Sequence, residues 1–100
     1  MKTVVFSQEA REELDRAYAE SLALGSSIYE RFKIEVRDAL ETIGANPEAG
    51  GKVGWREYRR FIFHTPPYSF IYCEEADSIS IAAFAHHSRK PGYWRKRLTS

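Results

Sequence analysis

The apolar positions in the first half of the chain predict one short strand followed by two helices. Residues 3–6, TVVF, form a β-branched and aromatic run that favours a strand. Ser7 then suits a helix N-cap, with Glu9 in the first turn where the helix dipole favours negative charge. Beyond it, apolar residues recur at the three- and four-residue spacing of amphipathic helices. The first stripe is Ala10, Leu14, Ala17, Tyr18, Ser21 and Leu22, and the second is Ile28, Phe32, Val36, Ala39, Leu40 and Ile43.

Glycine, serine and proline predict where these two helices begin and end. Gly25 suits the C′ position of the first helix, and Ser26 or Ser27 is expected to cap the second. Gly44 and the Asn46-Pro47 pair are expected to end the second helix. Because only two or three residues join the helices, they should form an antiparallel hairpin.

The second half of the chain changes to the pattern of strands. The runs WREYRRFIFH, YSFIYCEE and SISIAAFAHH are rich in aromatic and β-branched residues, and TPP and EAD separate them. They predict a three-strand antiparallel meander. Strict alternation in the last run places Ile79, Ile81, Ala83 and Ala85 on one face and Ala82 and Phe84 on the other. A strand that is apolar on both faces should be central and covered from both sides.

Two remaining segments complete the organisation. PEAGGKVG (47–54) is glycine-rich, but a phosphate-binding loop would need a strand before it and a helix after it, so a linker loop is expected. After Pro91-Gly92, the segment YWRKRL predicts a short helical turn. The predicted fold is a single α+β domain over residues 1–100, with a helical hairpin packed on one face of a small sheet.

Composition limits the environment and the partners. One cysteine, Cys73, permits no internal disulfide, and no apolar run is long enough for a signal peptide or a membrane span. We therefore expect a complete, cytoplasmic protein that does not bind membranes. Residues 1–50 carry six Lys and Arg against ten Asp and Glu, whereas residues 51–100 carry nine against four. A basic half of this kind is either ordinary solvated surface or a binding surface for a polyanion or an acidic partner.

The adjacent histidines His86 and His87 raise the question of a metal or a catalytic site. Neighbouring residues on a strand point to opposite faces, and Cys73, His64 and the carboxylates show no ligand spacing. Neither Cys73 nor any serine lies in an elbow-type nucleophile motif. We expect no metal and no cofactor.

RNA cleavage is the one chemistry for which the second half carries the required groups. A histidine can act as acid or base near neutral pH, arginines can hold phosphate bidentately, and aromatic rings can stack on bases. The candidates are His86 or His87, then Arg59, Arg60 and Arg89, then Tyr68, Tyr93 and Trp94.

Each of these residues also has a structural or binding interpretation. His86 at the end of an apolar strand also fits a half-buried histidine of the core. Tyr93 and Trp94 equally suit packing of the tail onto the sheet. Arg, Tyr and Trp are also the residues most enriched at interface hot spots, so the same surface could hold an acidic partner without chemistry.

The order of elements and the last part of the chain resemble the RelE/ParE superfamily of bacterial toxins. These are the toxin components of type II toxin–antitoxin, or plasmid stabilisation, modules. The resemblance covers nearly the whole chain and is strongest in PPYSFIYCEEADSISIAAFAH and in the ending HxSRxPxYW. That ending consists here of His86, Ser88, Arg89, Pro91, Tyr93 and Trp94.

The RelE-like branch, ribosome-dependent mRNA endonucleases, is matched only in part. Its pattern has an arginine after the aromatic residue that opens the middle meander strand, where this chain has Ser69 after Tyr68. Only Arg89 and Tyr93 match its site residue by residue. Absence of one guanidinium would typically cost about 3 kcal/mol of transition-state stabilisation, which weakens the nuclease interpretation.

Two further basic positions of the RelE-like pattern also differ. Where that pattern has lysines on the first strand of the meander, this chain has Arg59 and Arg60 near the start of the strand. Where the pattern has a basic residue two places before the late arginine, here Arg89, this chain has His87. If the chain is a nuclease, the resemblance implies Arg89 and Tyr93, with His86 or His87, as its catalytic residues.

The ParE-like branch is similar in the ending H-x-x-R-x-P-x-Y-W and in lacking the strand arginine. Its members are described as inhibitors of DNA gyrase that act by binding. The resemblance therefore implies a bacterial cytoplasmic toxin, with DNA gyrase as the expected target and mRNA on the ribosome as the alternative. A small antitoxin with a disordered or acidic segment should cover it in a hetero-oligomer. The expected contact residues are Arg59, Arg60, Arg89, Tyr93, Trp94, Arg95, Lys96 and Arg97.

Overall fold

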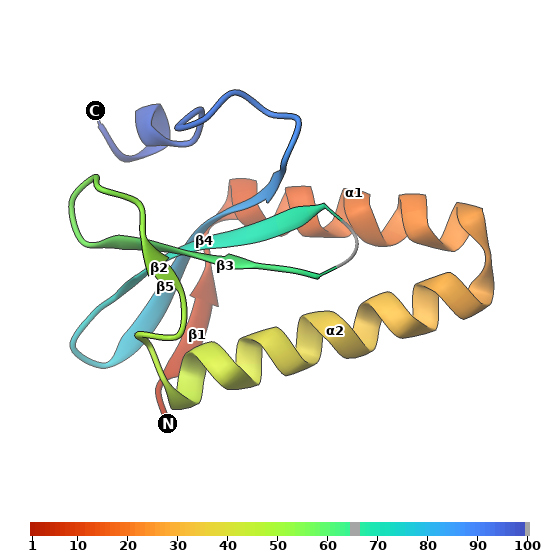
Figure 1. Ribbon diagram of the computed structural model, residues 1–100, viewed down its shortest axis with the longest axis horizontal. Helices are drawn as coiled ribbons and strands as arrows, with labels where there is room; N and C mark the ends of the chain where they lie inside the picture. The colour runs from red at the N-terminus through yellow and green to blue at the C-terminus, as the bar shows by residue number, and fades with distance from the viewer. Residues whose placement is uncertain (65–66, 100) are drawn as a thin grey trace.

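The computed structural model, which describes residues 1–64 and 67–99, has three layers (Figure 1). Helices α1 (Gln8–Leu24) and α2 (Ser26–Ala45) form an antiparallel hairpin on one face of a five-stranded sheet. The tail after the last strand crosses the opposite face and ends in a short 3₁₀ helix, η1 (Arg95–Leu98). The expected α+β fold, with its helical hairpin and terminal helical turn, is confirmed.

The sheet has the order β1-β5-β4-β3-β2. Strand β1 (Thr3–Phe6) pairs in parallel with β5 (Ser78–His86). β5, β4 (Tyr68–Glu74) and β3 (Tyr58–Ile62) form the predicted antiparallel meander. The prediction of a plain linker loop at 47–54 is wrong in one respect, because β2 (Gly51–Lys52) pairs with β3 as a fifth strand. Of the predicted TPP turn, Thr65 and Pro66 lie outside the described residues.

A single residue, Gly25, forms the boundary between the two helices. Ser7 caps α1 as expected, since its hydroxyl accepts from the Ala10 N–H at 3.1 Å. Gly25 alone then joins the two helices at a φ of 145°, a conformation that side-chain-bearing residues rarely adopt. Gly25 therefore occupies the N-cap position of α2, and the expected side-chain cap from Ser26 or Ser27 is absent.

The far end of α2 also departs from expectation. Gly44 does not end the helix; it lies inside the last turn, where its carbonyl accepts from the Lys2 N–H at 3.2 Å. The helix continues to Ala45, and Asn46 is its C-cap. Gly44 instead lets the N-terminal segment pass close by, because a Cβ there would lie 3.2 Å from the Lys2 carbonyl.

A β-bulge in β5 overturns the predicted assignment of its faces. Ile71 pairs with Ala83 but Tyr72 pairs with Ile81, so Ala82 has no partner on β4. An extra residue reverses the alternation beyond it. Phe84 therefore joins the two isoleucines of the strand in the helix-side core, whereas Ala83 and Ala85 face the tail.

The expectation that β5 is covered on both faces is confirmed by two apolar clusters. The larger lies between the sheet and both helices and includes Leu14, Phe32, Val36, Phe70 and Phe84. The smaller lies between the sheet and the tail and consists of Ile71, Ala83 and Trp94, with Val53, Trp55, Tyr58 and Leu98 around it. Ile28, the first member of the predicted α2 stripe, is 44% exposed because the hairpin extends beyond the end of the sheet (Figure 1).

Tyr72 ties the β2 loop to the sheet. Its side chain is fully buried, and its hydroxyl accepts from the Gly50 N–H at 2.8 Å and donates to the Pro47 carbonyl at 2.8 Å. A Cβ on Gly50 would lie 2.7 Å from the Arg60 carbonyl oxygen, whereas one on Gly51 would meet open space. The approach of this loop to β3 therefore requires glycine at position 50 only.

Gly50→Ala should lower the free energy of unfolding by about 1–3 kcal/mol, because backbone atoms must shift to admit the methyl group. Tyr72→Phe should cost about 1–3 kcal/mol, because the buried Gly50 N–H and the partly buried Pro47 carbonyl each lose a partner. Gly51→Ala is the matched control and should change stability by less than about 0.5 kcal/mol. Chemical denaturation of the three variants measures these values. Equal losses at positions 50 and 51 would contradict this account.

Candidate functional site

An ion pair between α1 and the tail occupies the edge of the sheet where β1 ends. β1 pairs with β5 only as far as Ile81, and the bulge follows directly. The Glu13 carboxylate accepts from the Phe84 N–H at 3.1 Å, and the Arg97 guanidinium donates to the Ala82 carbonyl at 3.2 Å. The two side chains thus supply partners to backbone groups of β5 that lie beyond the end of β1.

Glu13 and Arg97 also bind each other and Tyr93. The guanidinium donates to both carboxylate oxygens, at 3.0 and 2.8 Å, and the Tyr93 hydroxyl donates to Glu13 Oε2 at 2.6 Å. The Glu13 and Arg97 side chains are only 9% and 17% exposed. This network, Glu13–Tyr93–Arg97, fixes the tail against α1 and against β5.

The network sets the protonation of its members. Burial by itself would raise the pKa of Glu13, but hydrogen bonds from Arg97, Tyr93 and the Phe84 N–H outweigh it and lower the pKa. Burial and the bond to Glu13 raise the pKa of Tyr93, so its hydroxyl keeps its proton. The hydrogen bond to Glu13 also raises the pKa of Arg97. All three residues therefore stay in the protonation states that hold the tail.

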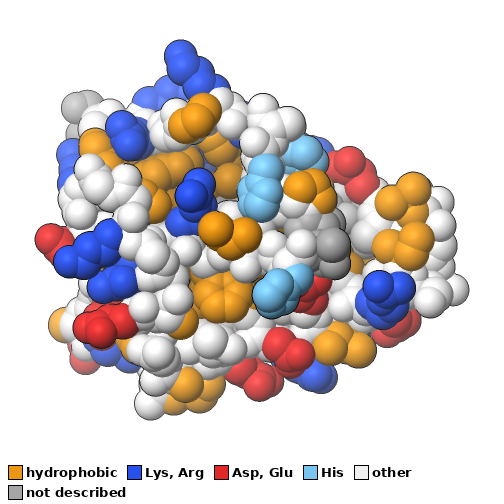
Figure 2. Space-filling view, viewed as in Figure 1, with side chains coloured by type: hydrophobic (Ala, Val, Ile, Leu, Met, Phe, Trp, Pro, Cys, Tyr) orange, Lys and Arg blue, Asp and Glu red, His pale blue; other side chains and the backbone are white. Residues whose placement is uncertain are grey.

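A cationic cleft of about 310 Å³ lies between the sheet and the tail. Ser69, Ile71 and Ala85 come from the strands, and residues 89–95 come from the tail. The residues that line it include five cations and, within the described parts of the chain, no Asp or Glu: Lys52, Arg60, Arg89, Lys90 and Arg95. None of the five takes part in an ion pair with another described residue. Figure 2 shows Lys and Arg gathered over the upper part of this view, where the tail runs.

Arginines of the protein itself cover the aromatic rings beside the cleft. The Arg89 guanidinium lies 3.9 Å from the centre of the Tyr93 ring, and that of Arg97 lies 5.0 Å away. Arg56 and Arg95 lie 4.3 and 5.5 Å from the Trp55 ring. A stacked guanidinium leaves its N–H edges free for an oxyanion. The aromatic ring beneath it is less available for stacking with a nucleic-acid base.

The two histidines lie on opposite sides of the end of β5, as the sequence predicted. The His86 ring packs edge-on against Tyr68, with centroids 5.1 Å apart, and its Nδ1 accepts from the Ser88 N–H at 3.0 Å. His87 Nε2 lies 2.9 Å from the hydroxyl oxygen of Ser69, which is buried on the tail side. Ser69, which occupies the position of the strand arginine, is therefore part of the cleft floor and bonded to His87.

The structure brings together only some of the expected contact residues. Arg60, Arg89, Tyr93, Trp94 and Arg95 line the cleft. Trp94 is 4% exposed and belongs to the tail-side core. Arg59, by contrast, donates to the Gly50 carbonyl at 2.7 Å, Arg97 is in the network with Glu13, and Lys96 is exposed outside the cleft.

Sequence reasoning missed Lys52, Lys90 and Glu13. Lys90 follows Arg89 directly, so its place in the chain was a usable signal. Lys52 lies in the segment read as a linker and reaches the cleft only because β2 pairs with β3. Glu13 had no local signal, because its partners lie 71 to 84 residues away.

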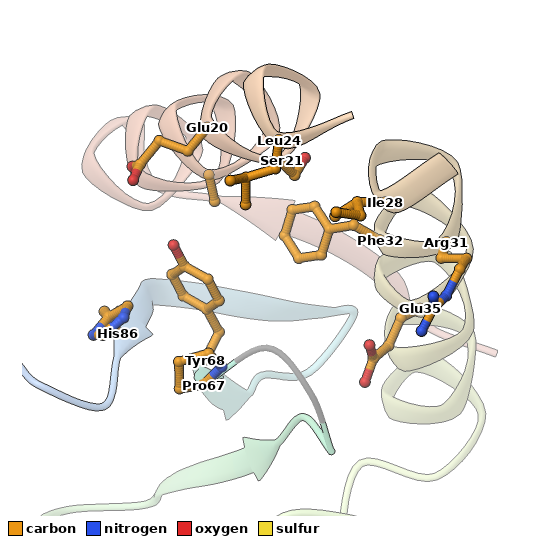
Figure 3. Close-up of a pocket in the computed structure, with 11 residues that line it drawn as sticks. Glu20, Ser21, Leu24, Ile28, Arg31, Phe32, Glu35, Pro67, Tyr68 and His86 are labelled. Atoms are coloured by element: carbon orange, nitrogen blue, oxygen red, sulfur yellow. The ribbon is translucent and has the colours of Figure 1, made fainter. Parts of the chain in front are cut away.

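A second hollow, an apolar groove of about 460 Å³, opens between the helical hairpin and the end of the sheet at which β4 begins and β5 ends. Figure 3 shows Tyr68 pointing from the sheet toward the helices, with His86 beside it. Leu24 and Ile28, at the end of the hairpin, are 73% and 44% exposed. The groove lining is Ala17, Glu20, Ser21, Leu24, Ile28, Arg31, Phe32, Glu35, Pro67, Tyr68 and His86. His86 lines both the groove and the cleft.

Three findings concern other kinds of site. Residues 1–64 and 67–99 contain no group of three or more His, Cys, Asp and Glu side chains placed to hold a metal ion. No helix in the described part of the chain is both long and apolar enough to cross a membrane. Cys73 is a free, partly buried thiol whose pKa is raised by burial and by nearby glutamates.

Comparison with known proteins places this small α+β domain with its cationic cleft in a family. The fold is similar to that of a solved structure described as the chromosomal ParDE TA system from P. aeruginosa, with a TM-score of 0.72 and 18% identity over 86% of this chain and 96% of the other. A family model described as the ParE toxin of the type II toxin–antitoxin system parDE matches residues 4–91. The chain therefore belongs to the ParE toxin family, as its sequence suggested. No curated protein matches it in sequence.

Glu13→Gln should lower the free energy of unfolding at pH 7 by about 3 kcal/mol, because it leaves Arg97 with an uncompensated, largely buried charge. The lowered pKa of Glu13 gives stability that is complete above its ordinary value of 4.5 and is lost as the pH falls through the lower pKa of the folded protein. The variant should therefore lose less stability than the wild type between neutral and acid pH. Denaturation curves measured across that range test both expectations.

The matched control is Glu41→Gln, which removes an exposed ion pair with Arg37 within α2. It should cost at most about 0.5 kcal/mol. The ion-pair account is wrong if Glu13→Gln is as mild as this control, or if both proteins lose stability in parallel on acidification.

Proposed function

We propose that this ParE-family protein inhibits bacterial growth by binding a target, DNA gyrase, through the cationic cleft and the exposed basic tail, and that a cognate antitoxin neutralises it in the cytoplasm. The target follows from the resemblance to the gyrase-inhibiting branch. The binding mode is supported by five cations around one cleft that form no ion pair with any other described residue, which favours an anionic surface of a partner.

The observation that favours binding over RNA cleavage is the position of the Tyr93 hydroxyl. The hydroxyl donates to Glu13 at 2.6 Å, so it is directed away from any substrate in the cleft. Its pKa is raised, so it does not ionise near neutral pH. Ser69 is buried and bonded to His87 where RelE-like proteins carry an arginine. Of the two residues that match the RelE-like site, Arg89 and Tyr93, only Arg89 is exposed.

The apolar groove supports an antitoxin as the second partner. The helical hairpin extends beyond the sheet, so Leu24 at the end of α1 and Ile28 near the start of α2 line an open hollow and are largely exposed. An amphipathic helix of the antitoxin that lays apolar side chains into the groove would complete the core at this end. Such a helix covers apolar surface without needing the cleft.

The purified toxin should inhibit DNA supercoiling by gyrase, and Arg60→Ala and Arg89→Ala should each raise the concentration needed for half inhibition by about tenfold, the effect of removing one charge-assisted hydrogen bond. A binding surface spreads its losses, so neither variant alone should abolish inhibition. Arg37→Ala, an exposed arginine on α2, is the control and should behave as the wild type. Supercoiling that is unaffected by the wild-type toxin, or new mRNA 5′ ends in a translating extract, would overturn the proposed target.

The groove is tested by antitoxin rescue. Ile28→Asp should leave growth inhibition intact but weaken antitoxin binding by about thirtyfold, because a carboxylate would be placed in the apolar contact. Ile34→Asp, on the same helix and 48% exposed but outside the groove, is the control. Growth of cells that also express the antitoxin, with calorimetry of the purified pair, measures both effects. Full rescue of Ile28→Asp would place the antitoxin elsewhere.

A further inference from the structure

We propose that Tyr93 is a positioning residue, which holds the Arg89 guanidinium in the orientation that meets the target and does not contact the target itself. The family resemblance offered Tyr93 as a catalytic or contact residue, so this role differs from the expected one. It rests on the target binding proposed above. It also makes Glu13, a residue of α1 that does not line the cleft, part of how the cleft works.

The orientation of Arg89 depends on one aromatic ring. Its guanidinium lies 3.9 Å from the centre of the Tyr93 ring, the shortest cation–π contact among the described residues. Within residues 1–64 and 67–99, the same guanidinium forms no ion pair and no side-chain hydrogen bond. Arg60, across the described part of the chain, lacks these contacts and also lacks a ring beneath it. Tyr93 is therefore the side chain that distinguishes a held arginine from a free one.

The Tyr93 ring is itself fixed at both ends. Its backbone N–H donates to the Lys90 carbonyl at 3.1 Å, and its hydroxyl donates to Glu13 Oε2 at 2.6 Å. Glu13 cannot easily move, because its carboxylate also accepts from the Phe84 N–H and from Arg97 and its side chain is only 9% exposed. A line of contacts thus runs from α1 through the ring to the guanidinium in the cleft.

Tyr93 has little left with which to contact a target directly. Its hydroxyl is bonded to Glu13, and the guanidinium groups of Arg89 and Arg97 lie over its ring at 3.9 and 5.0 Å. Arg89, by contrast, is exposed and lines the cleft. An effect of Tyr93 on the target should therefore pass through Arg89.

A fixed guanidinium binds an oxyanion better than a mobile one. A guanidinium that lies flat on a ring keeps its N–H edges open for a carboxylate or a phosphate. Because a flexible side chain loses rotamer freedom when it binds, ordering Arg89 in advance should strengthen target binding about fivefold. That gain should disappear when the ring is no longer anchored to Glu13.

The functional test is a double-mutant cycle on the inhibition of DNA supercoiling by gyrase. Tyr93→Phe keeps the ring and removes only its hydrogen bond to Glu13, so it should raise the concentration needed for half inhibition about fivefold. In an Arg89→Ala background the same change should have less than about a twofold effect, because the group that it positions is gone. In an Arg60→Ala background the fivefold effect should remain. Equal effects in all three backgrounds would overturn the proposal.

Ile43→Val is the control for lost stability. Ile43 is fully buried in the helix-side core, and its truncation lowers stability modestly without touching the tail. This variant should inhibit supercoiling like the wild type. If it weakens inhibition as much as Tyr93→Phe does, the effect of Tyr93 is one of stability and the positioning role is wrong.

NMR relaxation of the free toxin tests the positioning without any target. The Nε–Hε group of Arg89 should have a higher order parameter than that of Arg60, and in Tyr93→Phe it should fall to the Arg60 value. Arg89→Lys and Arg60→Lys assign the two signals. Equal order parameters in the wild type, or no change in Tyr93→Phe, would overturn the proposal. An ordered Arg89 in a toxin that leaves supercoiling unaffected would support the positioning and refute the proposed target alone.

Discussion

The bidentate ion pair between Glu13 and Arg97 is the contact on which the arrangement of the three layers depends. One carboxylate receives hydrogen bonds from the Phe84 N–H, from Tyr93 and from Arg97, and it does so at a sheet edge that β1 is too short to cover. Buried backbone groups need partners, and here two side chains from opposite ends of the chain supply them. α1 and the tail are thereby joined around the edge of β5.

A bulge at Ala82 lies beside this uncovered edge. It leaves Ala82 without a partner on β4 and reverses the faces of the residues that follow, so that Phe84 packs under the helices and Ala83 packs under Trp94. Bulges often re-aim side chains beside functional sites. In this protein the bulge gives the tail a small, flat apolar surface to pack on, and the tail forms one wall of the cleft.

The residues that the sequence offered as catalytic or contact residues serve three different purposes in the fold. Tyr93 and Arg97 hold the tail, Trp94 fills the tail-side core, and Arg60 and Arg89 remain free at the cleft. This division of roles is one reason why we propose that the protein acts by binding.

The sequence by itself determined the elements other than β2, and their order, because helical and strand periodicity and turn residues are local signals. The hairpin, the meander and the α+β fold follow from them, and the family resemblance follows from the ending of the chain. What only the tertiary structure decided are features that depend on distant partners: the single-residue turn at Gly25, the bulge at Ala82, and the bond from Glu13 to Arg97. The cleft belongs to this second group, since its cations come from β2, β3 and the tail and meet only when the sheet has formed.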